Sequence, residues 1–242
     1  MKKTIILALM AVICSLGANA QSNWRGTRNN YSRSNYSSRG NYSSRGSSFN
    51  RTNYNYYSFR PYVGLRIGPA FSTVNSDDKY LDGGISRTGL DIGVVAGMPL
   101  TQVAPLYLET GLEYVEKGGK SGKKSAYDNM TYSLNYLEVP ITLKYIYNID
   151  RSFSVQPYAG GYLACGVGGK IKNFDNRAAY NSFGESSYNF KRFDGGLKIG
   201  CGIGMDMFYA DLSYDIGLSN ISHDNFDESK NGSLQLTVGM NF

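Results

Sequence analysis

The chain has 242 residues, of which 41% are hydrophobic, with 29 glycines, 21 tyrosines and a formal net charge of +6. Beyond the N-terminus no stretch approaches the roughly 20 apolar residues that a spanning helix requires, which excludes a helical membrane protein. Three cysteines and one histidine are too few for a cysteine and histidine metal centre, and we expect no cofactor.

Residues 1–20 are typical of a secretory signal peptide. Two lysines precede an apolar run over residues 5–16, and Ala18-Asn19-Ala20 forms a small-residue cleavage pattern. The apolar run is too short to be a stable membrane span. The sequence therefore predicts export, with a mature chain that begins at Gln21.

Residues 21–58 consist mainly of Ser, Asn, Arg, Tyr and Gly, and the stretch 35–40 recurs as 41–46. This composition buries too little apolar surface to offset chain entropy, so we expect a disordered periplasmic extension. It carries six arginines and no acid, whereas residues 59–242 carry 17 basic and 19 acidic residues. Interleaved Arg and Tyr also occur in single-strand nucleic-acid binders, but export argues against a nucleic acid. We expect a passive spacer, with binding to peptidoglycan, anionic lipid or an acidic protein partner as the alternative.

From residue 59 onward, the chain repeatedly alternates apolar and polar residues. Period-two alternation is typical of a strand with one apolar and one polar face. Each segment is long enough for a tilted membrane strand, which needs about 9–11 residues. The eight segments are 60–73, 89–98, 106–116, 133–147, 153–167, 192–205, 208–221 and 233–242.

The connections between these segments alternate between long and short. The long ones are 75–88, 117–132, 168–191 and 222–232, and the short ones are 99–105, 148–152 and 206–207. Outer-membrane barrels of Gram-negative cells have long outer loops, short periplasmic turns and an even number of strands. For residues 59–242 the sequence therefore predicts an all-β fold, an eight-stranded antiparallel up-and-down transmembrane β-barrel in the outer membrane. We expect the lysines of 117–132, Lys117, Lys120, Lys123 and Lys124, to contact lipopolysaccharide.

The apolar faces carry the side chains that we expect to meet outer-membrane lipid. Their aromatic residues form two predicted girdles: Tyr145, Tyr147, Phe153, Phe208 and Phe242 near the short turns, and Phe71, Tyr114 and Phe193 near the long loops. Cys165 and Cys201 lie on the same faces. We expect two separate lipid-facing thiols, while an oxidising compartment leaves a disulfide open as the alternative.

The polar faces carry charged residues that we expect to point into the barrel. They are Arg66, Asp91, Glu109, Glu113, Glu138, Lys144, Asp194, Lys198, Asp211 and Asp215. An eight-stranded barrel is just wide enough for side chains to fill it, so these residues predict a packed structural network of ion pairs and hydrogen bonds. A narrow proton or ion path is the alternative.

Four motifs resemble the PorT-like small outer-membrane barrels, often labelled the porin family: Tyr136–Tyr145, Gln156–Gly161, Arg192–Leu197 and Gly217–Ile221. The resemblance covers residues 60–242 and includes Pro140, which we expect a local bulge to accommodate. It implies the barrel fold and, because a few members are tied to protein secretion, a secretion-associated role as an alternative. Outer-membrane barrels display a C-terminal aromatic residue to the barrel-assembly machinery, so the resemblance implies that Phe242 is an assembly signal.

The sequence offers little support for catalysis. Glu109 and Glu113 share a strand face about 14 Å apart, farther than the roughly 5–9.5 Å between glycosidase carboxylates. His223, with Ser222 beside it, raises the possibility of a hydrolase on the outer rim, but no nucleophile motif supports it. We therefore expect a structural or interaction protein of the cell envelope, not an enzyme. A narrow pore or secretion-associated component is the second interpretation, and a rim enzyme is the third.

Overall fold

The computed structural model describes residues 60–76, 85–120, 130–150, 152–172, 178–185, 189–223 and 228–242. The chain divides into a unit up to Ser58 and a unit from Phe59 onward. The predicted signal peptide and extension lie outside the described residues. In the second unit, the long strands are β1 (Tyr62–Ser76), β2 (Ile85–Pro99), β3 (Leu106–Lys120), β4 (Thr131–Tyr145), β6 (Phe153–Gly168), β9 (Phe193–Met205), β10 (Phe208–Gly217) and β11 (Ser229–Asn241).

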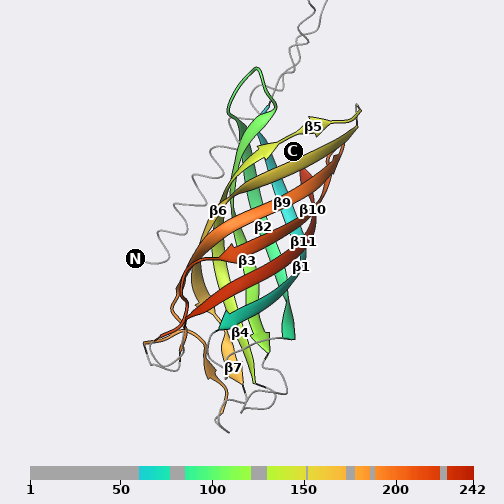
Figure 1. The fold of residues 1–242 in the computed structure, drawn as a ribbon. Coiled ribbons are helices and arrows are strands. Elements are labelled where there is room, and N and C mark those ends of the chain that lie inside the picture. The colour runs from blue at the N-terminus through green and yellow to red at the C-terminus, as the bar shows by residue number, and fades with distance from the viewer. Residues whose placement is uncertain are drawn as a thin grey trace, which may run out of the picture. The chain divides into compact units, whose positions relative to one another are not determined.

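These eight strands of the described chain close into a barrel (Figure 1). Their order around the wall is β6-β9-β10-β11-β1-β2-β3-β4, and β4 pairs back with β6. All the pairings of this ring are antiparallel, which confirms the predicted eight-stranded barrel. Three short strands extend it: β5 (Tyr147–Asn148) pairs with β6, and β7 (Lys170–Lys172) pairs with β4 and with β8 (Tyr180–Asn181). The short turns and the C-terminus lie at one end of the barrel, and β7 lies at the other.

The alternation of side chains explains why this sheet closes as it does. Along β10, exposed and buried residues alternate without interruption. Asp211 and Asp215 point inward, whereas Leu212 points outward and is 52% exposed. Polar residues inside and apolar residues outside are the reverse of a soluble protein and require an apolar surrounding medium. Among the described residues, no helix has the length and apolar character needed to cross a membrane.

Several strands continue beyond their predicted ends at the long-loop end of the barrel. β3 reaches Lys120, where the prediction ended at residue 116, and β2 begins at Ile85, where the prediction began at residue 89. Glycines and polar residues in these extensions hide the apolar alternation. The backbone ladder needs no apolar side chains, so pairing continues out to Lys120 and its partner Thr131. β10 is shorter than predicted, because it ends at Gly217, where the prediction ended at residue 221.

The expected bulge at Pro140 is wrong. β4 keeps one register with β3 on both sides of the proline, from Thr110 opposite Ile141 to Glu113 opposite Glu138. The ladder with β3 is interrupted between these pairs, as expected for a residue without an N–H donor. The register shift of β4 lies instead at Asn135 and Tyr136, on the side that faces β6.

Cys165 and Cys201 are both free and exposed on the outer wall. In the β6–β9 ladder, Cys165 lies opposite Phe193, whereas Cys201 lies opposite Pro157. The two levels are eight residues apart along β6, about 26 Å at 3.3 Å per residue. A disulfide within the barrel wall is excluded, since its Cα atoms must lie within about 7 Å.

Candidate functional site

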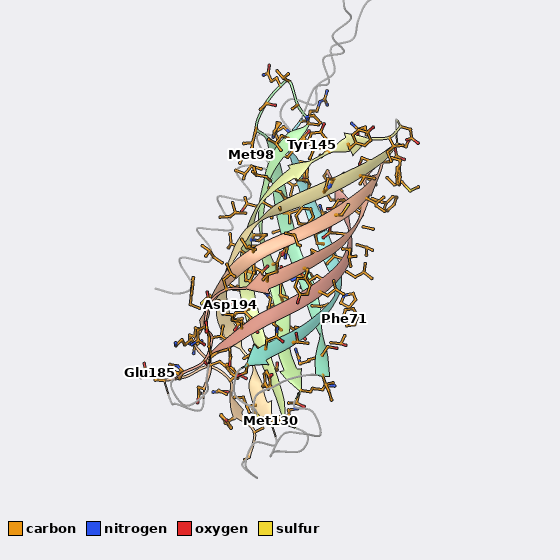
Figure 2. The ribbon with its side chains drawn as sticks, viewed as in Figure 1. Phe71, Met98, Met130, Tyr145, Glu185 and Asp194 are labelled. Atoms are coloured by element: carbon orange, nitrogen blue, oxygen red, sulfur yellow. The ribbon has the colours of Figure 1, made fainter. Side chains whose placement is uncertain are left out.

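The lumen is the candidate site, because it holds the charged residues that the sequence singles out. All ten predicted interior residues are buried, and none is more than 8% exposed. They come from six of the long strands, and Asp194 is labelled in Figure 2. Eight of them form two groups with neighbouring residues, the central cluster (Glu113, Lys117, Glu138, Lys198, Asp215 and Gln235) and the turn-side cluster (Tyr62, Arg66, Glu109, Lys144, Tyr158, Tyr209 and Asp211).

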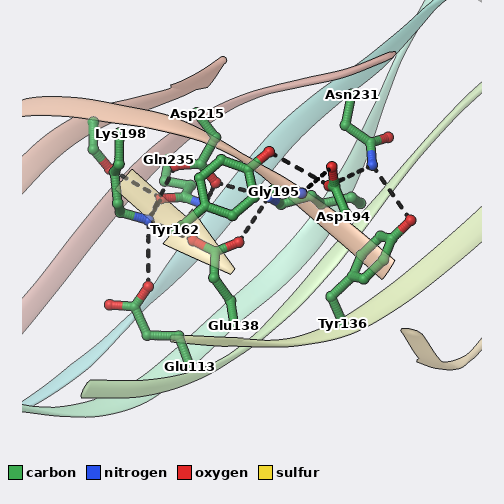
Figure 3. Close-up of polar contacts among 12 residues, drawn as sticks. Glu113, Tyr136, Glu138, Tyr162, Asp194, Gly195, Lys198, Asp215, Asn231 and Gln235 are labelled. Carbon is green, nitrogen blue, oxygen red and sulfur yellow. Dashed lines mark hydrogen bonds and ion pairs between the residues drawn. The ribbon is translucent and has the colours of Figure 1, made fainter. Parts of the chain in front are cut away.

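In the central cluster, one ammonium group from β9 contacts acids on three other strands (Figure 3). Lys198 Nζ lies 3.3 Å from Glu113 Oε2 on β3, 3.0 Å from Glu138 Oε1 on β4 and 3.1 Å from Asp215 Oδ1 on β10. It also donates to Gln235 Oε1 on β11 at 2.7 Å. β9 and β10 are neighbours, whereas β3 and β4 belong to another part of the wall. The ammonium therefore links opposite walls across the lumen.

Lys117 is the functional residue that the sequence interpretation misplaced. It was assigned to a lysine-rich surface loop, but its side chain is fully buried in the central cluster. Its ammonium lies 2.7 Å from Glu138 Oε2 and 2.9 Å from Asp215 Oδ2, and 4.1 Å from the centre of the Tyr162 ring. Extending the inward parity of Glu113 along the strand would have placed Lys117 in the lumen. The predicted loop boundary at residue 117 concealed this position.

The turn-side cluster is built around Glu109. Lys144 Nζ lies 2.6 Å from Glu109 Oε1, and Arg66 Nη2 lies 3.8 Å from Glu109 Oε2. The Tyr62 hydroxyl donates to the same carboxylate, and the Arg66 guanidinium stacks 3.9 Å above the Tyr209 ring centre. Asp211, the other acid of this cluster, accepts a hydrogen bond from the Tyr158 hydroxyl at 2.6 Å and one from the Tyr209 hydroxyl at 3.2 Å. This cluster lies toward the short turns, because β1 and β10 begin there.

Asp194 lies on the loop side of the central cluster and is held by hydrogen bonds. It accepts from the Asn231 amide at 2.8 Å, from the Tyr162 hydroxyl at 3.4 Å and from the backbone N–H of Gly195 at 2.8 Å. The Asn231 amide also donates to the Tyr136 hydroxyl at 3.4 Å. These contacts join β4, β6, β9 and β11 at one level of the barrel.

Above this level, aromatic and aliphatic side chains fill the lumen at the long-loop end. We call this group the cap, and its members are Val74, Met130, Tyr132, Leu134, Tyr136, Tyr162, Ala164, Ile171, Phe183, Phe190 and Ile221. Phe183, Phe190 and Ile221 come from the described parts of the connections, and the backbone bridges Phe183 to Phe190. The Phe190 ring packs on Tyr132 at 5.5 Å, and the Phe183 ring packs on Tyr136 at 5.4 Å. The sequence analysis did not predict that connections fold into the barrel.

Two glycines of β9 leave room for the tyrosines of the turn-side cluster. A side chain at Gly200 would overlap the Tyr158 ring, and one at Gly202 would overlap the Tyr209 ring. Both positions point inward, where the alternation along β9 places residues that line the lumen. Small residues on one strand therefore accommodate large rings from others, as close packing of a narrow barrel requires.

His223 and Ser222, the residues considered for a hydrolase on the outer rim, each form a hydrogen bond with another residue. His223 Nε2 donates to the carbonyl oxygen of Gly184 at 3.1 Å. The Ser222 hydroxyl donates to the Asn220 side chain at 2.7 Å. The acidic residues that follow His223 in the sequence, Asp224 and Asp227, lie outside the described residues, as do Lys123 and Lys124 of the lysine-rich loop.

The girdle and terminal residues lie where the alternation places them. Tyr145 and Phe71 are exposed near opposite ends of the barrel (Figure 2). Phe242 is 66% exposed at the short-turn end, and its backbone pairs with Val63 through hydrogen bonds of 2.7 and 3.1 Å. β11 and β1 thus form the seam that closes the sheet and removes both edges.

Three solved structures of bacterial proteins are similar to this chain. Ail, the attachment invasion locus protein of Yersinia pestis, is 16% identical with a TM-score of 0.39, over 75% of this chain and 98% of that one. Neisserial surface protein A is 16% identical with a TM-score of 0.44, over 75% and 97% of the two chains. OprG from Pseudomonas aeruginosa is 12% identical with a TM-score of 0.38, over 75% and 95%. No curated protein sequence matches the chain.

The family described as "Outer membrane protein beta-barrel domain" matches residues 19–223. The matched region includes β1 to β10, and β11 follows it. With its closed barrel, polar lumen and apolar outer wall, the chain belongs to this family of outer membrane β-barrel proteins.

Proposed function

We propose that this protein is a structural or interaction protein of the outer membrane and not an enzyme. The barrel anchors it in the membrane, the long connections face outside, and residues 21–58 form a tether on the periplasmic side. Residues 1–20 act as its export signal. Because β1 begins at Tyr62 at the short-turn end, the chain that precedes it joins the barrel at the end expected to face the periplasm.

The observation that supports this proposal is the blocked lumen. The turn-side cluster, the central cluster and the cap follow one another along the barrel. Salt bridges of 2.7–3.3 Å cross the lumen in the central cluster, and the described cap residues are buried above them. A cavity between the two polar clusters has a volume of about 20 Å³, which holds about one water molecule. This arrangement favours an anchor, because a solute path needs a continuous chain of waters.

A narrow pore or secretion-associated component is the alternative, and it rests on the resemblance to the PorT-like barrels. Opening a path would require the separation of Lys117 and Lys198 from the acids that they share, Glu138 and Asp215. Breaking buried ion pairs is costly, since the separated charges remain in an interior of low dielectric. The central cluster therefore favours the anchor over the pore.

If the barrel is an anchor, partners must bind its exposed parts. Outside, Lys120 is exposed at the end of β3 and is a candidate contact for lipopolysaccharide phosphates. In the membrane, the apolar wall contacts lipid. Inside, the six arginines of residues 21–58 suit peptidoglycan, anionic lipid or an acidic protein.

Conductance in planar lipid bilayers tests the blocked lumen. We expect the full-length protein to give no discrete conductance steps. A variant that replaces Lys117, Glu138, Lys198, Asp215, Arg66 and Glu109 with serine, and Phe183 and Phe190 with glycine, should give steps, because it opens the central cluster, the turn-side cluster and the cap without changing net charge. Replacing Phe183 and Phe190 with glycine serves as the matched control, since it thins the cap and leaves the central cluster in place. This control should stay silent. Folding of each variant is checked by its heat-modifiable mobility in gels, and steps from the wild-type protein would contradict the proposal.

A further inference from the structure

The lumen buries more acidic than basic side chains. Within the described residues, the seven buried acids are Asp91, Glu109, Glu113, Glu138, Asp194, Asp211 and Asp215. The four buried bases are Arg66, Lys117, Lys144 and Lys198. When all are ionised, three negative charges remain in excess. Uncompensated charge is strongly unfavourable in a protein interior, so this excess must be neutralised, either by a bound cation or by protonation of carboxyl groups.

Asp91 on β2 is the acid with the poorest compensation. It is 3% exposed, and its Oδ1 atom has no hydrogen-bond partner among the described residues. The charged groups that act on it from other strands are Glu113, Glu138, Asp215 and Lys198. Lys198 is the one cation of these four, and it already contacts all three of the acids. The Asp91 carboxylate is therefore left without a cation of its own.

A small cavity lies beside this carboxylate, between the central and turn-side clusters. Its volume of about 20 Å³ suits one water-sized species. The charged residues in its lining are Asp91, Glu109, Glu113, Asp211, Arg66 and Lys198. Acids outnumber bases here; Arg66 forms an ion pair of 3.8 Å with Glu109 and stacks on the Tyr209 ring, and its Nη2 atom has no hydrogen-bond partner among the described residues. The cavity thus combines a negative lining with an unpartnered, buried oxygen.

We propose that this cavity binds one Na⁺ ion, held by the carboxylates of Asp91 and Glu113. The volume suits a single dehydrated ion. The site offers two carboxylates, because among the described residues no group of three or more His, Cys, Asp or Glu is placed to hold a metal ion. Ca²⁺ and Mg²⁺ require at least six ligands, mostly oxygen, so the site fits a single positive charge better. The inference goes beyond the anchor role and does not depend on it.

The test is the stability of the purified full-length protein in detergent micelles, followed as the midpoint temperature of its heat-modifiable gel shift. NaCl replaces N-methylglucamine chloride at constant ionic strength, and the series is repeated at several pH values between 6 and 8. A bound cation stabilises the folded state by mass action. For a barrel of this size, we expect the midpoint to rise by about 3–6 °C per tenfold increase in the free Na⁺ concentration above the dissociation constant. A response to acid alone, with none to Na⁺, would show that protonation neutralises the carboxyl and would overturn the proposal.

Asp91→Asn is the decisive variant, because it keeps the shape of the side chain and removes one excess charge. Its midpoint should lie above that of the wild type at low Na⁺ and pH 8, and its cation response should be lost. Asp194→Asn is the matched control, since it removes a buried acid that does not line the cavity and should keep the wild-type response. Glu113→Gln provides a second variant if Asp91→Asn does not fold. A flat wild-type response, as expected for a bound water only, or equal responses in wild type and Asp91→Asn, would overturn the proposal.

Discussion

Lys117 joins two walls of the barrel through one ammonium group, which contacts Glu138 on β4 and Asp215 on β10. All three side chains are fully buried, so water does not solvate their charges in the folded barrel. Without Lys117, the carboxylates of Glu138 and Asp215 would share Lys198 as the remaining cation in contact with them. Breaking such a buried pair is far more costly than breaking a surface pair.

Lys117→Met should therefore lower the free energy of unfolding by about 3–5 kcal/mol, because it removes one partner of a buried ion pair and keeps much of the side-chain volume. The measurement is urea-induced unfolding in micelles, with the folded fraction determined from the heat-modifiable gel shift. Lys120→Met, an exposed position on the same strand, is the control and should change the free energy by no more than about 0.5 kcal/mol. Similar losses in both variants would refute the central role of Lys117.

At this scale, strand parity predicted which residues point inward. Asp211 and Asp215 are separated by an even number of positions along one strand, so both follow from alternation alone. Their partners do not follow from it. Asp215 meets Lys117 and Lys198 because closure of the sheet brings β3, β9 and β10 around one narrow lumen, and such distances are not encoded in local periodicity.

Among the elements, β11 determines whether the barrel closes. It pairs with β1 and with β10, and without it both neighbours would expose unpaired backbone groups in lipid. Phe242 follows directly after this strand and hydrogen-bonds to Val63 at the seam. Its ring is exposed at the short-turn end, where assembly factors on the periplasmic side would meet it.

Phe242→Asp should reduce the amount of folded barrel in the outer membrane several-fold, because it removes the predicted assembly signal from the closing strand. The measurement is the heat-modifiable fraction in isolated outer membranes. Phe208→Asp is the matched control, since Phe208 is similarly exposed at the same end but lies at the start of β10. It places a charge at the same interface without altering the C-terminus and should assemble. An equal defect in both variants would show that only the interfacial charge matters.

The elements show where local patterns lose information. Eight strands are predicted from alternation and eight form the closed ring of the described chain, but most of the predicted segments stop short of the observed strand ends at the long loops. Gly118 and Gly119 continue β3 through backbone pairing with Ser133 and Tyr132, which composition does not reveal. Pro140 was expected to need a bulge, yet missing hydrogen bonds toward one neighbour are sufficient to accommodate it.

At the scale of the whole molecule, the chain has two units of different character. Residues up to Ser58 form one and residues from Phe59 onward form the other. The first holds the basic excess, and the second is slightly acidic, with 17 basic and 19 acidic residues. Among the described residues, the ion pairs of the lumen join strands of the second unit.

Deleting residues 21–58 should leave the stability of the barrel unchanged, and it should remove crosslinked partners on the periplasmic side only if the extension binds them and is not a passive spacer. The measurement pairs the heat-modifiable midpoint of the purified protein with chemical crosslinking in cells, followed by identification of crosslinked partners. Replacing the six arginines of the extension with glutamine provides a control that keeps its length. A spacer role predicts that this variant retains the partners, whereas electrostatic binding predicts their loss. A destabilised barrel after the deletion would contradict the independence of the two units.

The sequence by itself determined the barrel class, the number of strands and the inward or outward direction of most side chains, because these depend on local composition and a period of two. It also predicts an export signal, which stays a prediction. Only the tertiary structure decided how the interior is neutralised. It places Lys117, which was predicted in a surface loop, in the lumen. It also places cap residues such as Phe183 in the barrel and Asp91 beside a small cavity. The physical reason is that charge compensation and packing depend on which strands face each other across the closed sheet.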